Sequence, residues 1–200
     1  TLSDTALKDI GDNGKVLIGL ANVEVASLLG GAGDDVFDAR ESTAQVVTRL
    51  GGGENEFYSS NANNNHVTHS LANTTAHDTL NGFNGKTTNL VIEGASNGNN
   101  VKFAGTTTDY TVTNFGREVI KANDVQGTSN LNAAPIEVKG GFGGDTVDVT
   151  DFAGRLWFNA GDGGDTLVFK DDFSGANTRF NGEDGFDTLI VKARDVGSTL

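Results

Sequence analysis

Five acidic or amide residues that follow glycine-rich turns are the residues of this chain best placed to do chemistry. Each stands just before a short apolar run, and the set comprises Asp35, Asn55, Asp145, Asp165 and Asp187. Carboxylate and carbonyl oxygens are the ligands of hard cations such as calcium, which takes roughly six to eight of them. The preceding glycines let the backbone curl so that its carbonyls point inward. The pattern therefore predicts cation sites in these turns.

The turns belong to a repeat, whose copies begin at Gly30, Leu50, Gly140, Ala160 and Gly182. The second copy lies 20 positions after the first, and the aspartates of the last three copies are 20 and 22 positions apart. A fixed period near 20 residues is typical of a solenoid. Because each copy is a turn followed by a short apolar strand, the sequence predicts an all-β parallel β-solenoid or β-roll. One solenoid domain over residues 1–200 is expected, with motif turns at 30–58 and 140–191.

The copies resemble the nonapeptide G-G-x-G-x-D-x-U-x of the RTX family, in which U is a large apolar residue. Residues 30–38 and 140–148 match it throughout, the copies at Ala160 and Gly182 depart at one or two glycines, and the Leu50 copy is degraded. The resemblance implies that stacked coils hold calcium between them. In that family the ligands are carbonyl oxygens at motif positions one, three and five and the side chain at position six.

Carried over to this chain, the resemblance implies a set of calcium ligands: Gly30, Asp34, Asp35, Asn55, Gly140, Phe142, Gly144, Asp145, Asp162, Gly164, Asp165, Asp184, Phe186 and Asp187. Ions are expected between the 140 and 160 turns and between the 160 and 182 turns. A third site, between the 30 and 50 turns, is less favoured because Asn55 brings no charge and Glu54 or Glu56 would have to compensate. The apolar residue at position eight should point inward, as Phe37, Phe57, Val147, Leu167 and Leu189.

Three segments without the motif leave alternatives open. Residues 93–136 show short polar–apolar alternation, which indicates half-buried strands in irregular coils or in an inserted hairpin that turns at Asn114-Phe115-Gly116. Residues 61–65 are rich in Asn and fit either a surface loop or a stacked Asn ladder. The run 21–29 fits a strand or a few helical turns. The rest of the chain is predicted to be almost entirely β.

Composition narrows the function classes. The net charge of −13 repels nucleic acid and anionic membranes, so cations are the natural partners. With no Cys, stability outside the cell must come from packing, backbone ladders or a bound hard metal. No run approaches the roughly 20 apolar residues of a membrane span, and the N-terminus lacks the pattern of a signal peptide. The chain is expected to be part of a larger protein.

Neither zinc binding nor catalysis is expected from the remaining polar residues. His66, His69 and His77 lie in a polar stretch, and they are expected to be solvated surface residues and not zinc ligands. No nucleophile elbow, paired-carboxylate signature or phosphate-binding loop occurs, so we expect no enzyme. A cluster of Lys102, Arg117 and Lys121, as a polysaccharide lyase or epimerase would need, is not demanded by the spacing.

The expected function is a calcium-dependent structural module of an exported bacterial surface protein, such as a surface layer, filament or adhesin. Its partners would be calcium, other copies or neighbouring domains. One alternative is an accessory or secretion module of a larger RTX enzyme or toxin. Another is a carbohydrate-binding module that contacts cell-surface polysaccharide through Trp157, Tyr58 and Tyr110.

Overall fold

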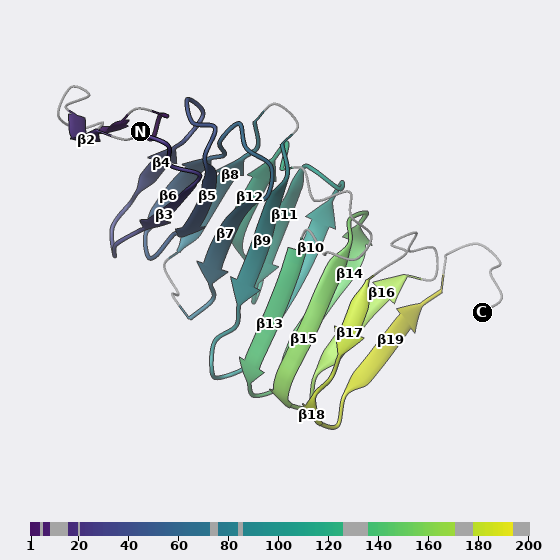
Figure 1. The fold of residues 1–200 in the computed structure, drawn as a ribbon. Coiled ribbons are helices and arrows are strands. Elements are labelled where there is room, and N and C mark those ends of the chain that lie inside the picture. Colours follow the sequence, from purple (N-terminus) through teal and green to yellow (C-terminus); the bar gives the residue numbers. More distant parts are fainter. Residues whose placement is uncertain are drawn as a thin grey trace.

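The computed structural model describes residues 1–4, 6–8, 16–19, 21–72, 76–83, 86–125, 136–170 and 178–193. Within these ranges every regular element is a strand, and most strand pairs are parallel. The strands form a solenoid of about seven turns that runs from the N-terminal to the C-terminal end of the chain (Figure 1). The predicted all-β parallel solenoid is therefore confirmed. No helix long and apolar enough to cross a membrane occurs in these ranges.

Each coil contributes to two sheets. The first sheet contains, in spatial order, β3 (Val25–Leu29), β5 (Gln45–Arg49), β7 (Asn65–Ser70), β9 (Thr88–Glu93), β13 (Ile136–Phe142), β15 (Leu156–Gly163) and β17 (Arg179–Asn181), with β18 (Asp184–Gly185) also paired to β15. The second contains β4 (Val36–Asp38), β6 (Glu54–Tyr58), β8 (His77–Asn81), β12 (Arg117–Asn123), β11 (Tyr110–Asn114), β10 (Asn100–Gly105), β14 (Thr146–Phe152), β16 (Thr166–Lys170) and β19 (Thr188–Lys192). A separate antiparallel pair joins β1 (Ala6–Lys8) and β2 (Val16–Gly19).

The core lies between the two sheets and is built by strand alternation. In β6 and in the first part of β14 every second side chain is buried. The buried residues are Asn55 and Phe57 in β6 and Val147 and Val149 in β14, so the inward face is mainly apolar. Register then stacks equivalent residues, because Phe37 pairs with Phe57 and Val147 with Leu167. Phe57, Val147 and Leu167 are buried, whereas Leu189 is 54% exposed because no further coil covers it among the described residues.

The central segment forms a meander that replaces one strand of the second sheet. Strands β10 and β11 pair antiparallel, as do β11 and β12, and the second hairpin turns at Phe115 and Gly116. The outer strands of the meander remain parallel to their neighbours, β10 to β14 and β12 to β8. The segment is thus an inserted hairpin and a part of the solenoid wall at once (Figure 1). Residues 126–135 of this segment lie outside the described ranges.

Aromatic rings pack behind the meander. The rings of Phe103 and Tyr110 each lie 5.4 Å from the ring of Phe152, measured between centroids, and all three side chains are buried. Because the meander makes the second sheet wider than the first here, large side chains are needed to fill the space between the sheets.

The structure also decides between the alternatives for residues 21–29 and 61–65. The run 21–29 contains strand β3. In the Asn-rich run, Asn65 is buried and its amide bonds the backbone of Val46, Ser60 and Ala62, whereas Asn61 is exposed. This run is therefore a surface turn held by one buried Asn.

Candidate metal centre

The turns that lead from the first sheet to the second, which we call the glycine turns, bring successive coils into close backbone contact. Gly141 and Gly161, at motif position two, have φ values of +109° and +91°, in the region that favours glycine. A Cβ atom added to Gly161 would lie 2.2 Å from the carbonyl oxygen of Gly141. Glycine at this position therefore serves both the turn and the stacking of the next coil.

Position six of these turns forms two columns along the solenoid. Strand register and side-chain hydrogen bonds place the members of the first column, Asp35, Asn55 and Asp78, on successive coils. The second column contains Asn99, Asp145, Asp165 and Asp187. All five position-six residues predicted from sequence thus stand beside another member of the set. Asp78 and Asn99 are additional members that the sequence reasoning missed.

In the second column each carboxylate uses one oxygen to bind the neighbouring coil. The amide N–H of Asp145 donates to Oδ1 of Asp165 at 2.6 Å, and the amide N–H of Asp165 donates to Oδ1 of Asp187 at 3.1 Å. Nδ2 of Asn99 donates to Oδ1 of Asp145 at 2.6 Å. The other oxygens, Oδ2 of Asp145 and Oδ2 of Asp165, are buried and have no hydrogen-bond partner.

These two unpartnered oxygens belong to carboxylates in an unfavourable environment. Asp145 is 2% exposed and Asp165 is not exposed at all. Burial raises the pKa of both groups, and the adjacent carboxylate raises it further, Asp165 for Asp145 and Asp187 for Asp165. Hydrogen bonds from Asn99 to Asp145, and from the Asp145 amide to Asp165, oppose this effect only in part. The ionised column therefore requires a positive charge nearby.

The residues present fit a calcium ion in that role. A Cβ atom placed on Gly140 would lie 2.3 Å from Oδ2 of Asp145 and 2.1 Å from the carbonyl oxygen of Ala160. A carboxylate oxygen of one coil and a backbone oxygen of the next thus converge above a glycine, where no side chain intervenes. Calcium favours such mixed oxygen sets, and bound there it would neutralise the repulsion along the column.

Side-chain clustering does not contribute to this fit. Among the described residues no group of three His, Asp or Glu side chains forms a metal cluster. In the family arrangement most ligands are backbone carbonyls, so the proposed site does not depend on such a cluster.

The side chains at motif positions three and five lie on the outside of the turns. Phe142 and Phe186 are 64% and 97% exposed. Asp162 and Asp184 pair in register and are exposed. Oδ1 of Asp34 accepts a hydrogen bond from the amide of Glu54 at 2.8 Å.

Only backbone oxygens at these positions could face an ion, and their assignment as ligands remains a prediction. The carbonyl of Phe142 accepts a hydrogen bond from the amide of Gly98 at 3.3 Å. Gly144 and Gly164 occupy position five in adjacent coils, where a Cβ on Gly144 would lie 3.1 Å from the Gly164 carbonyl oxygen. The turns are therefore stacked closely enough for carbonyls of two coils to act together.

The first column is satisfied in a different way. The amide N–H of Asp35 donates to Oδ1 of Asn55 at 3.0 Å, and Nδ2 of Asn55 donates to Oδ1 of Asp78 at 2.8 Å. Oδ2 of Asp78 lies 2.5 Å from Nδ1 of His69. Asn55 and Asp78 thus have partners for both side-chain polar atoms. The predicted third calcium site, near Asn55, has less need of a metal than the second column.

His69 corrects the expectation of three solvated histidines. It is 1% exposed and points into the core beside Asp78, so that expectation is wrong for this residue. His66 is on the opposite, outer face of the same strand, as its spacing predicts. His77 is partly exposed and lies 3.1 Å from Glu118.

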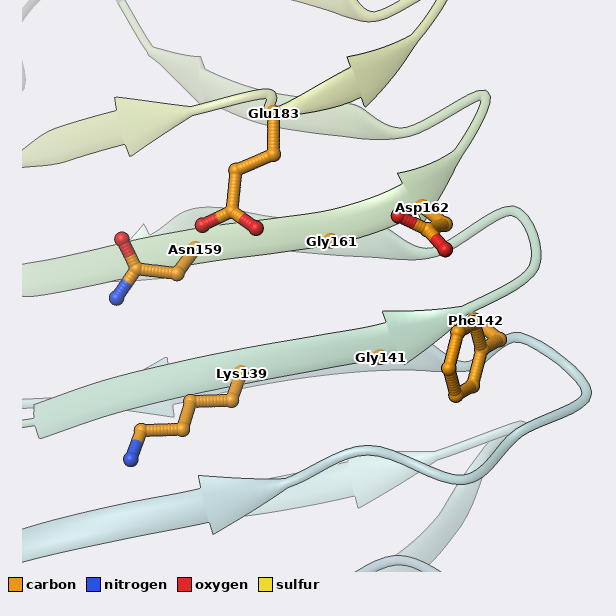
Figure 2. A pocket seen from close by; sticks show the side chains of 7 residues that line it. All are labelled: Lys139, Gly141, Phe142, Asn159, Gly161, Asp162 and Glu183. Atoms are coloured by element: carbon orange, nitrogen blue, oxygen red, sulfur yellow. The ribbon is translucent and has the colours of Figure 1, made fainter.

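A groove with a volume of about 530 Å³ lies on the outer face of the first sheet, beside the turns of the second column. Its floor is formed by Gly141 and Gly161, which have no side chains (Figure 2). Polar and aromatic side chains surround the floor: Lys139, Phe142, Asn159, Asp162 and Glu183. The conformation of the glycine turns therefore creates a groove as well as the acidic column.

Comparison with family models, with curated proteins and with solved structures finds no match for this chain.

One signal in the sequence marks Asp78. The triplet Asp-Thr-Leu at 78–80 repeats the Asp-Thr-Val or Asp-Thr-Leu that begins the strand at Asp145, Asp165 and Asp187. No glycine stands between the preceding strand and this triplet, which hides the match. Asn99 carries no comparable signal.

Replacing Asp165 by Asn should reverse its effect on stability when calcium is added. The raised pKa means that the ionised Asp165 opposes folding above its unfolded pKa of about 4 and does not below it. In metal-free buffer at neutral pH, Asp165→Asn should therefore retain more β-type circular dichroism than the wild type, and the gain should vanish below about pH 4. With calcium present the same variant should melt below the wild type.

Asp184→Asn is the matched control, because it removes the same charge from a side chain that is exposed. Circular dichroism of all three proteins without calcium, and thermal melts with calcium, provide the measurement across this pH range. Equal responses of the two variants to calcium would show that the buried column is not the calcium site.

His69→Leu should destabilise the chain by about 3–5 kcal/mol, because it leaves a buried carboxylate without its partner. His66→Leu, on the outer face of the same strand, should change stability far less. Urea unfolding monitored by circular dichroism compares the two variants. A similar loss in both would mean that the contact between His69 and Asp78 contributes little.

Proposed function

We propose that this chain is a calcium-dependent structural module of an exported bacterial surface protein, such as a surface layer, filament or adhesin. The observation that carries the proposal is the pair of buried, unpartnered carboxylate oxygens in the stacked column, Oδ2 of Asp145 and Oδ2 of Asp165. In this proposal calcium binds to these oxygens and to the surrounding turn carbonyls, and its binding is coupled to folding and assembly outside the cell.

The electrostatics of the chain support an extracellular setting for this coupling. A net charge of −13 opposes compaction, and the second column concentrates part of that charge in the core. Extracellular modules bind calcium with dissociation constants of about 10⁻⁴ to 10⁻³ M, so such a module would stay unliganded in the cytosol. With no Cys in the chain, bound calcium would take the stabilising role that disulfides have in many exported proteins.

The module is proposed to act without catalysis, as a structural element. The acidic residues of the second column are committed to contacts between coils, which leaves them no free geometry for acid–base chemistry. The alternative, an accessory or secretion module of a larger RTX enzyme or toxin, uses the same calcium chemistry. Sequence on either side of this chain would distinguish the two.

A second candidate function, contact with a cell-surface polysaccharide, is favoured by the groove over Gly141 and Gly161. The groove combines an exposed aromatic ring, Phe142, with the polar groups of Asn159, Asp162 and Glu183 (Figure 2). Sugars are bound by such sets, in which a ring covers the apolar face of the sugar and polar side chains bond its hydroxyls.

The aromatic residues that the sequence suggests as polysaccharide contacts are less suitable. Tyr110 is 4% exposed and lies in the core. Trp157 is only partly exposed, and the Arg179 guanidinium lies 4.5 Å from the centre of its ring. Arg40 lies 4.3 Å from the centre of the Tyr58 ring. Arginines thus already occupy the ring faces on which a sugar would stack.

Chelation of calcium should abolish most of the β-type circular dichroism of the chain, because the ionised second column then repels itself in the core. Adding calcium back should restore the spectrum, whereas the same concentration of magnesium should restore much less, since Mg²⁺ demands a near-ideal octahedron. A spectrum unchanged in excess EGTA would refute the coupling of calcium binding to folding.

Phe142→Ala should weaken binding to purified cell-wall polysaccharide about 5- to 10-fold, as expected for the loss of one stacking ring. The control is Phe186→Ala, which removes an exposed Phe that does not line the groove. Affinity electrophoresis or calorimetry with calcium present measures both. Absence of binding by the wild type, or an equal loss in both variants, would remove this candidate function.

A further inference from the structure

The first gap of the second column, between the coils that carry Asn99 and Asp145, differs from the gaps that follow it. Asn99 is 4% exposed and has an amide where the next members of the column have carboxylates. Its Nδ2 atom donates to Oδ1 of Asp145 at 2.6 Å and to the carbonyl oxygen of Ala95 at 3.4 Å. Its Oδ1 atom accepts from the amide of Ala95 at 3.2 Å. Both polar atoms of this buried side chain are therefore partnered within the protein.

The Nδ2 atom of Asn99 lies where the next coil has an unpartnered oxygen. A Cβ atom added to Gly94 would lie 2.7 Å from Nδ2 of Asn99 and 1.8 Å from the carbonyl oxygen of Gly140. In the next coil, a Cβ atom added to Gly140 would meet Oδ2 of Asp145 and the carbonyl oxygen of Ala160. The two turns thus share one arrangement, in which a hydrogen-bond donor of Asn99 takes the place of a free carboxylate oxygen of Asp145.

This exchange changes the charge and the ligands that each gap offers. The gaps after Asp145 and after Asp165 each lie between two carboxylates, and each contains a buried Oδ2 atom without a hydrogen-bond partner. The gap after Asn99 contains one carboxylate, whose Oδ1 atom already accepts the amide hydrogen. A calcium ion there would meet an N–H donor, which is no ligand for a hard cation.

The first column contains the same device. Asn55 is 2% exposed, and its Nδ2 atom donates to Oδ1 of Asp78 at 2.8 Å. In both columns an Asn at position six therefore bonds the carboxylate of the following coil directly. Because the two columns are separate, the behaviour belongs to the position in the turn and not to one local contact.

The meander explains why a neutral residue stands at position 99. In inner coils Oδ1 of the position-six carboxylate accepts an amide from the preceding coil, as Asp165 does from Asp145 at 2.6 Å. No glycine turn precedes Asn99 in this way among the described residues, because the other neighbour of β10 is β11, which is antiparallel to it. A buried carboxylate at position 99 would lack that hydrogen bond, so a neutral amide is the more stable group there.

We propose that Asn99 caps the calcium column, because the residue at position six decides whether the gap to the following coil takes a cation. The gaps after Asp145 and Asp165 take calcium, and the gap after Asn99 is closed by its amide. This inference rests on the proposed function, since it determines how many ions the second column holds and where they lie. Asn99 is in this sense a specificity-determining residue, which excludes metal from a turn otherwise shaped to receive it.

The test exchanges the two residue types within the column. Asn99→Asp replaces the donor by an oxygen and should raise the number of calcium ions bound at saturation by one. Asp145→Asn makes the reverse change and should lower that number by one. The double variant, Asn99→Asp with Asp145→Asn, has the composition and net charge of the wild type and should bind the wild-type number. Equilibrium dialysis against calcium counts the bound ions, and circular dichroism of the same samples reports folding.

Asn97→Asp is the matched control, because it makes the same charge change at an exposed residue of the same turn and should leave the ion count unchanged. A folded Asn99→Asp variant that binds no additional ion would overturn the cap and leave the calcium function standing. If Asn99→Asp does not fold even with calcium, Asp145→Asn decides, and an ion count equal to that of the wild type would overturn the cap. A wild type that binds no calcium would contradict the proposed function and the cap together.

Discussion

Parallel in-register stacking is the constraint on which this structure depends, because it places each side chain on its equivalent in the next coil. For apolar positions the result is favourable, and Val147 on Leu167 builds the core. At position six the same register stacks Asp145 on Asp165, both buried. The core and the acidic column are therefore products of one geometry. A solenoid with this repeat must compensate the buried charge by some means.

The two columns differ in how far groups within the protein compensate this buried charge. In the first column an amide, Asn55, stands between two carboxylates, and His69 lies against Asp78, so the side-chain polar atoms of Asn55 and Asp78 are partnered within the protein. In the second column one oxygen on each of two carboxylates lacks a partner. The meander separates the columns, since Asp78 pairs with Ile120 of β12 and not with Asn99. The strands inserted between them, at roughly 4.8 Å each, keep the two sets of charges well apart.

Much of this arrangement could be predicted from the sequence, for a definite reason. The copies at 30, 140, 160 and 182 encode turn, acidic residue and inward strand together, so spacing alone places Asp145, Asp165 and Asp187 on successive coils. The contact of His69 with Asp78 could not be predicted, because it joins the two sheets of one coil across a turn that lacks the motif. In the sequence the meander is marked only by short polar–apolar alternation, which fits irregular coils and hairpins equally.

The two columns differ in how their buried polar groups are partnered, so the two halves of the solenoid are not equivalent. Each coil contacts only its neighbours, so local charge balance decides local stability. The coils that carry Asp35, Asn55 and Asp78 hold their polar groups without a metal, whereas those that carry Asp145 and Asp165 leave oxygens open to one. In the proposed calcium-dependent module, sensitivity to a cation is therefore concentrated in the C-terminal half.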